Sequence, residues 1–374
     1  MGVLEIIFGI FAIVGALDKI FGNRLKLGEE FEKGIASAGS LVLAAVGMIT
    51  LTPTISKILV PVLGPVAEFF HIDQSFIGSF IANDMGGAIM AEELSPGTIW
   101  ATYNGLIVAS MLGVTVCFTI PIPFKTIDKK HHKDVLSGIL CGIATMPIGC
   151  IVGGLMIGCP FFPLLLNTLP VILMSVIICV GLILNPDLCR KIFGIIASII
   201  LVIMTVGLGA GVFAHITGIV LIPHMKPVMD GFKIVAGVAI VLSGVYPLLK
   251  TISIVFEKPL SMLGKVLKIN NTSVIGLITS LVNSIPTFAL VEKMNAKGII
   301  MNMAFAVSGA FVFGSQIAFT MAFNKDYVFA MIVGKLVAAA CALVAAHFLY
   351  KNSHDNSIAD EHIDTGEKTM EIGQ

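Results

Sequence analysis

Charged residues are scarce in this chain. Lys, Arg, Asp and Glu make up 12% of its 374 residues, against roughly 25% in a typical soluble domain. Hydrophobic residues make up 56%, and the mean hydropathy is +0.99. Apolar stretches of about 20 residues recur from end to end, and each is long enough to cross the ~30 Å hydrocarbon core of a bilayer as a helix. The composition therefore predicts an all-α, polytopic helical bundle in a lipid bilayer.

Several other features are missing, and each absence excludes a class of function. The formal net charge is zero, so there is no concentrated basic surface for nucleic acid. The seven cysteines form no CxxC pair and have no histidine at ligand spacing, which favours packing roles. HExxH and Gly-x-Gly-Asp motifs are absent, as is a second intramembrane aspartate for a catalytic dyad. We expect no enzyme, no catalytic residue, no metal and no cofactor.

The apolar pattern predicts nine spans and two interrupted stretches, or about 10–11 helices. The first span has no basic region or cleavage site that would mark a signal peptide. The stretches 54–94 and 257–294 contain Pro, Gly, Asn and charge, so each is either a re-entrant hairpin or two short helices. Spans are expected near residues 3–22, 34–52, 98–121, 134–158, 162–184, 190–222, 231–256, 297–323 and 326–350.

Basic loops predict the orientation, because Lys and Arg collect on the cytoplasmic side. FKTIDKKHHKD (124–134) is the strongest such loop, and residues 23–33 and 189–191 fit the same side. The spans at 34–52 and 231–256 then run in opposite directions, provided each interrupted stretch makes an even number of crossings. The polar end from residue 351 to 374 predicts a disordered cytoplasmic tail after a single transporter domain, 1–350.

The two opposed halves contain similar sequences. TPTISKILVPVLGPV (52–66) is similar to LKTISIVFEKPLSMLGKV (249–266), and the sequence at 75–94 is similar to that at 273–294. Together these similarities predict an inverted repeat, with repeat A at about 34–158 and repeat B at about 231–350. Inverted repeats are typical of secondary transporters, whose substrate sites form near mid-membrane where broken helices meet.

The sequence ANDMGG (82–87) places a carboxylate in apolar surroundings. An ionised Asp84 at the bilayer centre costs at least ~3 kcal/mol, so it is either a counter-charge for a cationic substrate or coupling ion, or an interfacial helix cap. Asn83 beside it adds a hydrogen-bonding group. Gly86 and Gly87 permit local unwinding that exposes carbonyls to a ligand, or close helix packing.

The corresponding stretch of the second half, VNSIPTF, contributes Asn283, Ser284 and Pro286. Pro286 lacks a backbone donor, so it either leaves a carbonyl for a small ammonium or simply kinks a helix. Ser315 and Gln316 lie in the apolar span 297–323, where polar groups bind substrate or a neighbouring helix. Tyr103 is expected to close the substrate site from the other side.

Five motifs together resemble the ethanolamine permease family of bacterial ethanolamine-utilisation operons. They are DMGG (84–87), TMPIGCIVGGL (145–155), FEKPLSMLGKVLKINN (256–271), NMAFAVSGAFVFG (302–314) and IVGKL (332–336). The resemblance extends from the first span to the last. It implies a multi-pass carrier of the bacterial plasma membrane that takes up ethanolamine by alternating access. The oligomeric state, including a homo-oligomer, is left open.

The chain departs from the family pattern in its second half. Where the family has Gly-Asp-His-Leu, this sequence has Gly314, Ser315, Gln316 and Ile317, and Ser284 stands where the family has a second Asn. A protonated amine in a dry site needs a counter-charge, and Asp84 is the remaining deep candidate. Either Asp84 suffices, or the solute is a related cation such as choline. Uniport, proton or sodium coupling, and a non-transporting sensor remain alternatives.

Overall fold

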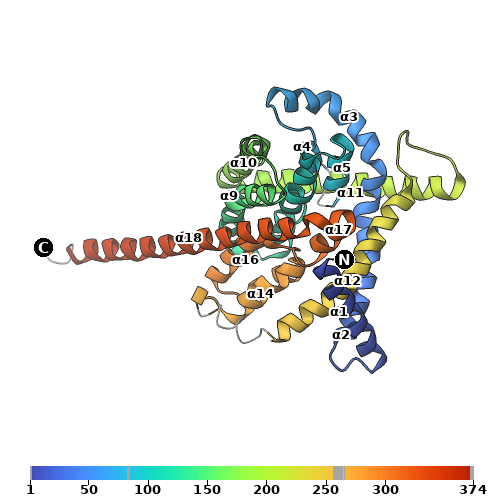
Figure 1. Ribbon diagram of the computed structural model, residues 1–374. Coiled ribbons are helices and arrows are strands. Elements are labelled where there is room, and N and C mark those ends of the chain that lie inside the picture. The colour runs from blue at the N-terminus through green and yellow to red at the C-terminus, as the bar shows by residue number, and fades with distance from the viewer. Residues whose placement is uncertain (1, 82–84, 256–263, 265, 371–374) are drawn as a thin grey trace.

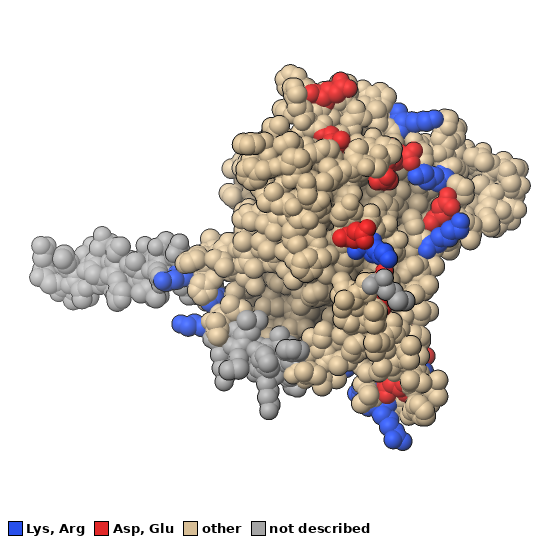
Figure 2. All heavy atoms as spheres, in the orientation of Figure 1, with Lys and Arg blue, Asp and Glu red and all other residues tan. Residues whose placement is uncertain are grey.

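A computed structural model describes residues 2–81, 85–255, 264 and 266–370, with side chains up to Lys351. Within these ranges the regular structure is entirely helical (Figure 1), which confirms the all-α prediction. Seven of the described helices are long and apolar enough to cross a membrane. Figure 2 shows large areas of one face without charged side chains. These features confirm a polytopic membrane bundle.

The helices of the first part of the chain are interrupted by several π-helical turns, here labelled η1 to η3. In order they are α1 (Val3–Ile20), α2 (Leu27–Leu41), η1 (Val42–Val46), α3 (Gly47–Phe69), α4 (Phe76–Ile81), α5 (Gly86–Leu94), α6 (Ile99–Thr102), η2 (Tyr103–Val108), α7 (Ala109–Val114), η3 (Thr115–Thr119), α8 (Pro121–Thr126), the 3₁₀ turn η4 (Lys129–His131) and α9 (His132–Met156). Wide turns of this kind often mark functional sites in helices.

The second part contains both the longest helices and the shortest ones. It consists of α10 (Phe161–Leu184), α11 (Pro186–Thr217), α12 (Val228–Val255), α14 (Asn271–Val282), α15 (Ile285–Ala289), η5 (Val291–Lys293), α16 (Ala296–Gly309), α17 (Ser315–Asn324), η6 (Lys325–Tyr327) and α18 (Val328–Met370). The C-terminal part of α18 projects beyond the body of the molecule (Figure 1). The expected tail from residue 351 onward thus continues the backbone of this helix.

The predicted end of a span at residue 52 is wrong. The structure has a continuous helical segment, Leu27–Phe69, which passes Pro53. A proline in a helix removes one backbone hydrogen bond and crowds the preceding turn. The π-helical turn η1 lies just before it, and the hydroxyl of Thr52 donates to the carbonyl oxygen of Met48 at 2.9 Å. The interruption in stretch 54–94 therefore comes later, beyond Phe69.

The single span predicted at 297–323 is also wrong, because the helix breaks between α16 and α17. Phe311 adopts φ 61°, and its N–H donates to the carbonyl of Ser280 at 2.9 Å, while that of Phe313 donates to Leu281 at 2.8 Å. Gly314 lies so close to α14 that a Cβ there would stand 2.0 Å from the carbonyl oxygen of Val282. The end of α14 therefore accepts the backbone hydrogen bonds of residues in this break, in place of bonds within a helix.

Helices α9, α16 and α18 pack together at the centre of the molecule (Figure 1). Small residues allow the closest crossing: a Cβ on Gly149 would lie 2.4 Å from the carbonyl oxygen of Gly334, and one on Gly334 would lie 3.2 Å from the Cα of Gly153. Glycines at such crossings let helix backbones approach where lipid offers no hydrophobic driving force. This rigid centre supports the broken helices around it.

Candidate functional site

A cavity of about 240 Å³ lies where broken helices from both halves of the chain meet. Met85 reaches it from the start of α5, Asn283 and Ile285 from the break between α14 and α15, and Ser315 from the start of α17. We call it the break cavity. Its lining residues are Ser37, Ser40, Leu41, Ala44, Met85, Phe118, Leu242, Tyr246, Val282, Asn283, Ile285, Phe311 and Ser315.

The polar groups of the break cavity are hydroxyls and one amide. Ser37 and Ser40 lie one turn apart on α2, and their hydroxyls donate to the carbonyls of Gly34 and Ser37 at 2.6 and 2.8 Å. The side-chain oxygen of Asn283 accepts from the N–H of Ile285 at 2.9 Å. No carboxylate is found among the described residues of the lining. These groups provide hydrogen bonds but no negative charge.

The carboxylate expected at this site lies outside the described residues, as does its neighbour: Asp84 and Asn83 fall in the gap at 82–84. Met85, the residue that follows them, lines the break cavity. Gly86 and Gly87 are buried at the start of α5. A Cβ on Gly78 of α4 would lie 2.8 Å from the carbonyl oxygen of Gly87, so Gly78 permits close packing of α4 on this part of α5.

Two predicted residues lie buried beside the lining. Ser284 is 0% exposed, and its hydroxyl has no hydrogen-bond partner in the part of the chain that is described. Gln316 is buried in the first turn of α17, next to Ser315. An unsatisfied buried hydroxyl costs about 1–3 kcal/mol. Ser284 does not itself line the break cavity, but it lies between Asn283 and Ile285, which do.

The other two predicted residues lie elsewhere. Pro286 is exposed in the first turn of α15, where a missing N–H costs no hydrogen bond. It therefore starts a helix rather than kinking one. The hydroxyl of Tyr103 lies 2.7 Å from that of Thr168, and both side chains are fully buried in contacts between η2 and α10. Tyr103 does not line the break cavity.

Lys335 was missed as a candidate, although it lies within the IVGKL sequence. It is 0% exposed in the middle of the membrane-spanning part of α18. Its ammonium donates to the carbonyl oxygen of Ser110 on α7. Ionisable residues at this depth are usually functional and interact with partners inside the bundle. The available signal was a single lysine within the apolar span 326–350.

A second cavity, of about 480 Å³, carries acidic groups. Glu92, Glu93 and Asp230 line it together with Lys226, whose ammonium lies 2.7 Å from the carboxylate of Glu93. We call it the acidic cavity. The remaining lining residues are Ile49, Ile89, Pro96, Ile234 and Phe323. Lys233 lies 3.7 Å from the carboxylate of Asp230. Three carboxylates and two lysines leave one net negative charge, which attracts cations.

The same helices wall both cavities, with apolar side chains between them. On α5, the N-cap residue Met85 lines the break cavity and Ile89 lines the acidic cavity. On α17, Ser315 lines the break cavity and Phe323 lines the acidic cavity. Buried between these positions lies one apolar cluster: Ala45, Val46, Ile49, Met85, Ala88, Ile89, Leu106, Val228, Val235, Val238, Leu242, Ala318 and Phe319. The two cavities are therefore arranged in line and separated by an apolar barrier.

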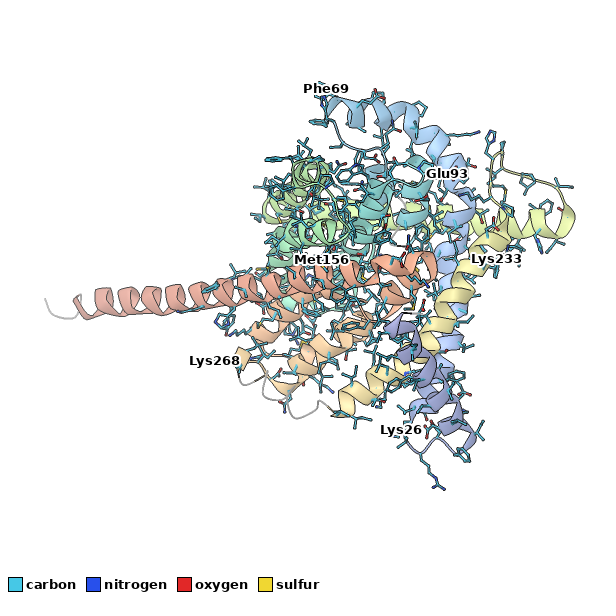
Figure 3. The ribbon with its side chains drawn as sticks, in the orientation of Figure 1. Lys26, Phe69, Glu93, Met156, Lys233 and Lys268 are labelled. Atoms are coloured by element: carbon cyan, nitrogen blue, oxygen red, sulfur yellow. The ribbon has the colours of Figure 1, made fainter. Side chains whose placement is uncertain are left out.

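The side chains labelled in Figure 3 indicate at which end of the molecule the acidic cavity lies. In Figure 3, Glu93 lies in the upper right part of the molecule, whereas Lys268 lies at the lower left and Lys26 at the bottom. Lys26 belongs to the segment 23–33, which the basic-loop rule assigns to the cytoplasm, and the same rule places the basic segment around Lys268 on that side. The acidic cavity thus lies toward the end of the molecule opposite these loops.

The comparisons with known proteins agree along almost the whole chain. The family model for the ethanolamine utilisation protein EutH matches residues 2–349. A probable ethanolamine permease EutH of Listeria monocytogenes is 42% identical over 343 residues, 91% of each chain. Its namesake in Escherichia coli is 36% identical over 391 residues, 93% of this chain and 96% of that protein. No solved structure matches. The chain therefore belongs to the EutH family of ethanolamine utilisation proteins.

Proposed function

We propose that the protein is a permease that carries ethanolamine into the bacterial cell by alternating access. The observation that carries this proposal is the break cavity, in which interrupted helices from both halves of the chain meet. Such positions hold the substrate in transporters built from repeats. The names of the relatives favour the same solute, and permease names favour transport over catalysis.

The contacts within each half support the proposed inverted repeat. The side-chain amide of Asn104 donates to the hydroxyl of Ser75 at 2.8 Å, and that of Asn302 donates to the carbonyl of Ser273 at 2.9 Å. Each pair is separated by 29 residues. In each half the serine opens the segment before a helix break, and the buried asparagine lies on the helix that follows. The same spacing in both halves is expected if the two halves are copies of one structural unit.

We propose that Asp84 provides the counter-charge for the substrate ammonium. Met85 at the cavity wall supports this assignment, because it is the next residue in the chain. Helix α14 ends at Val282 in the same wall, and the negative end of its dipole favours a cation. Asn283, Ser284 and Ser315 supply hydrogen bonds to the substrate hydroxyl, with Gln316 behind them.

The apolar barrier supports alternating access over an open channel. Substrate in the break cavity would reach the acidic cavity only after the apolar cluster between them, which includes Ala88, Ala318 and Phe319, has opened. The negative charge of the acidic cavity raises the local concentration of a cationic solute. A rocking movement of one repeat against the other would open one cavity as it closes the other.

Transport in proteoliposomes tests the proposal. Purified protein is reconstituted, and uptake of labelled ethanolamine is measured with unlabelled ethanolamine, choline and other small amines as competitors. We expect ethanolamine to compete best, and Asp84→Asn to abolish uptake while the exposed control Asp187→Asn retains it. Varying pH, sodium and membrane potential separately distinguishes uniport from coupled transport. Binding without uptake would favour a sensor, and preferential competition by choline would favour another organic cation.

A further inference from the structure

A second feature lies on the outer surface of the bundle, between α8 and α11. Here a groove of about 580 Å³ has two lysines at one end and an apolar wall along the rest. The lysines are Lys125 of α8 and Lys191 of α11, both exposed. The wall consists of Gly194, Ile195, Ser198, Ile199, Val202 and Ile203. The groove shares no lining residue with the break cavity or the acidic cavity.

The charge at the groove is not neutralised by neighbouring residues. Within the described part of the chain, neither Lys125 nor Lys191 makes an ion pair. In contrast, the adjacent Arg190 lies 2.9 Å from the carboxylate of Asp187. Two cations that converge on one groove without an acidic partner suit an anionic group with several oxygen atoms.

The wall has the length and polarity of a site for an acyl chain. Lys191 and Ile203 are 12 positions apart on one helix, or about 18 Å along its axis, close to the ~15 Å thickness of one hydrocarbon leaflet. Ile195, Ile199 and Val202 are 59%, 53% and 60% exposed. The hydroxyl of Ser198 donates to the carbonyl of Gly194 at 2.7 Å, so it adds no unsatisfied polar group.

We propose that this groove binds an anionic phospholipid of the cytoplasmic leaflet. Its phosphate lies between Lys125 and Lys191, and one acyl chain extends along α11 toward Ile203. Lys125 and Lys191 fall within the basic segments 124–134 and 189–191, which the basic-loop rule places on the cytoplasmic side. Basic pockets between membrane helices on that side bind anionic headgroups. A second copy of the chain fits less well, because a symmetric contact would bring two lysine pairs together.

Thermal unfolding of the purified full-length protein in neutral detergent tests this site. Phosphatidylglycerol, phosphatidylcholine and glycerol 3-phosphate are each titrated into the wild type and into the double variant Lys125→Gln/Lys191→Gln. The matched control is Lys129→Gln, which removes a nearby exposed lysine outside the groove. A second variant, Lys125→Arg/Lys191→Arg, keeps both charges. Size-exclusion chromatography with light scattering gives the oligomeric state of each.

We expect phosphatidylglycerol to raise the melting temperature of the wild type, of Lys129→Gln and of the double arginine variant, and phosphatidylcholine to do so much less. Each lysine contributes about a fivefold gain in affinity near an anionic headgroup, so the double glutamine variant loses roughly 30-fold. The proposal is overturned if phosphatidylcholine or glycerol 3-phosphate stabilises as well as phosphatidylglycerol, or if the double glutamine variant retains the effect. It is also overturned if Lys129→Gln loses the effect equally. A dimeric wild type with a monomeric double glutamine variant would likewise overturn it, because the groove would then bind a second copy of the chain.

Discussion

The buried hydroxyl of Ser284 gives a prediction with two opposite effects. In the substrate-free protein this hydroxyl is 0% exposed and has no partner in the described part of the chain. Replacing it with hydrogen in Ser284→Ala removes the cost of an unsatisfied buried group, about 1–3 kcal/mol. The small loss of volume offsets part of this gain. We therefore expect the substrate-free variant to be at least as stable as the wild type.

With substrate present, the same change has the reverse effect. If Ser284 donates to or accepts from ethanolamine in the break cavity, the variant loses one hydrogen bond to a charged or hydroxylated ligand. Hydrogen bonds that involve a charged group contribute about 1.5–3 kcal/mol, which corresponds to roughly 10- to 150-fold in Kd. The stabilisation by ethanolamine then shrinks although the protein itself has become more stable.

Thermal unfolding with and without ethanolamine, together with uptake in proteoliposomes, measures both effects. Ser175→Ala is the matched control, because Ser175 is also buried with an unpaired hydroxyl but lies on α10, which contributes no residue to the cavity lining. Both variants should gain stability, and only Ser284→Ala should lose affinity. Unchanged ethanolamine affinity in Ser284→Ala would refute its role in the site, and a clear loss of substrate-free stability would show that its hydroxyl is already satisfied.

Three further predictions concern the scaffold. Gly314→Ala puts a Cβ 2.0 Å from a carbonyl oxygen of α14, so we expect a loss of about 1–3 kcal/mol in unfolding free energy and impaired uptake. The control Gly39→Ala has open space around it in a helix and should not lower the melting temperature. Lys335→Met removes a charged donor from a buried carbonyl and should cost about 1.5–3 kcal/mol by thermal unfolding, whereas an unchanged melting temperature would contradict this. The ammonium of Lys130 donates a hydrogen bond to the carboxylate of Glu292, with N to O at 2.6 Å, and holds the pKa of Glu292 below its usual value of 4.5. The contribution of this ion pair to the stability of the protein is therefore complete above pH 4.5 and is lost as the pH falls through the lowered pKa. The melting temperatures of wild type and Glu292→Gln should converge on acidification, and a constant difference would contradict the assignment.

Long, uninterrupted spans could be predicted well from the sequence. The span expected at 134–158 appears as α9, His132–Met156, and that at 162–184 appears as α10, Phe161–Leu184. Both are continuous apolar runs bounded by polar residues or by Pro160, so local composition alone defines them. The all-α class and the membrane setting follow from the same runs.

The break at 310–314 could not be predicted in this way. Its residues, Ala-Phe-Val-Phe-Gly, are as apolar as the helices on either side. What interrupts the helix is a pair of backbone hydrogen bonds to Ser280 and Leu281, about 30 positions earlier. Such long-range contacts override local propensity and leave little trace in composition.

The candidate site was predicted in part. Asn283 and Ser315 were expected because polar residues in apolar spans are costly, and both line the break cavity. Ser37 and Ser40 were missed, since small hydroxyl residues one turn apart are common in membrane helices. Tyr103 was expected at the site, but its partner, Thr168, comes from a helix distant in sequence.

The hydrogen bonds that hold the break at 310–314 involve main-chain atoms on both sides. The bend next to Ser315 is therefore formed by backbone hydrogen bonds. If Ser315 contacts the substrate as proposed, a substitution there alters the polar lining of the break cavity without altering the hydrogen bonds that form the bend.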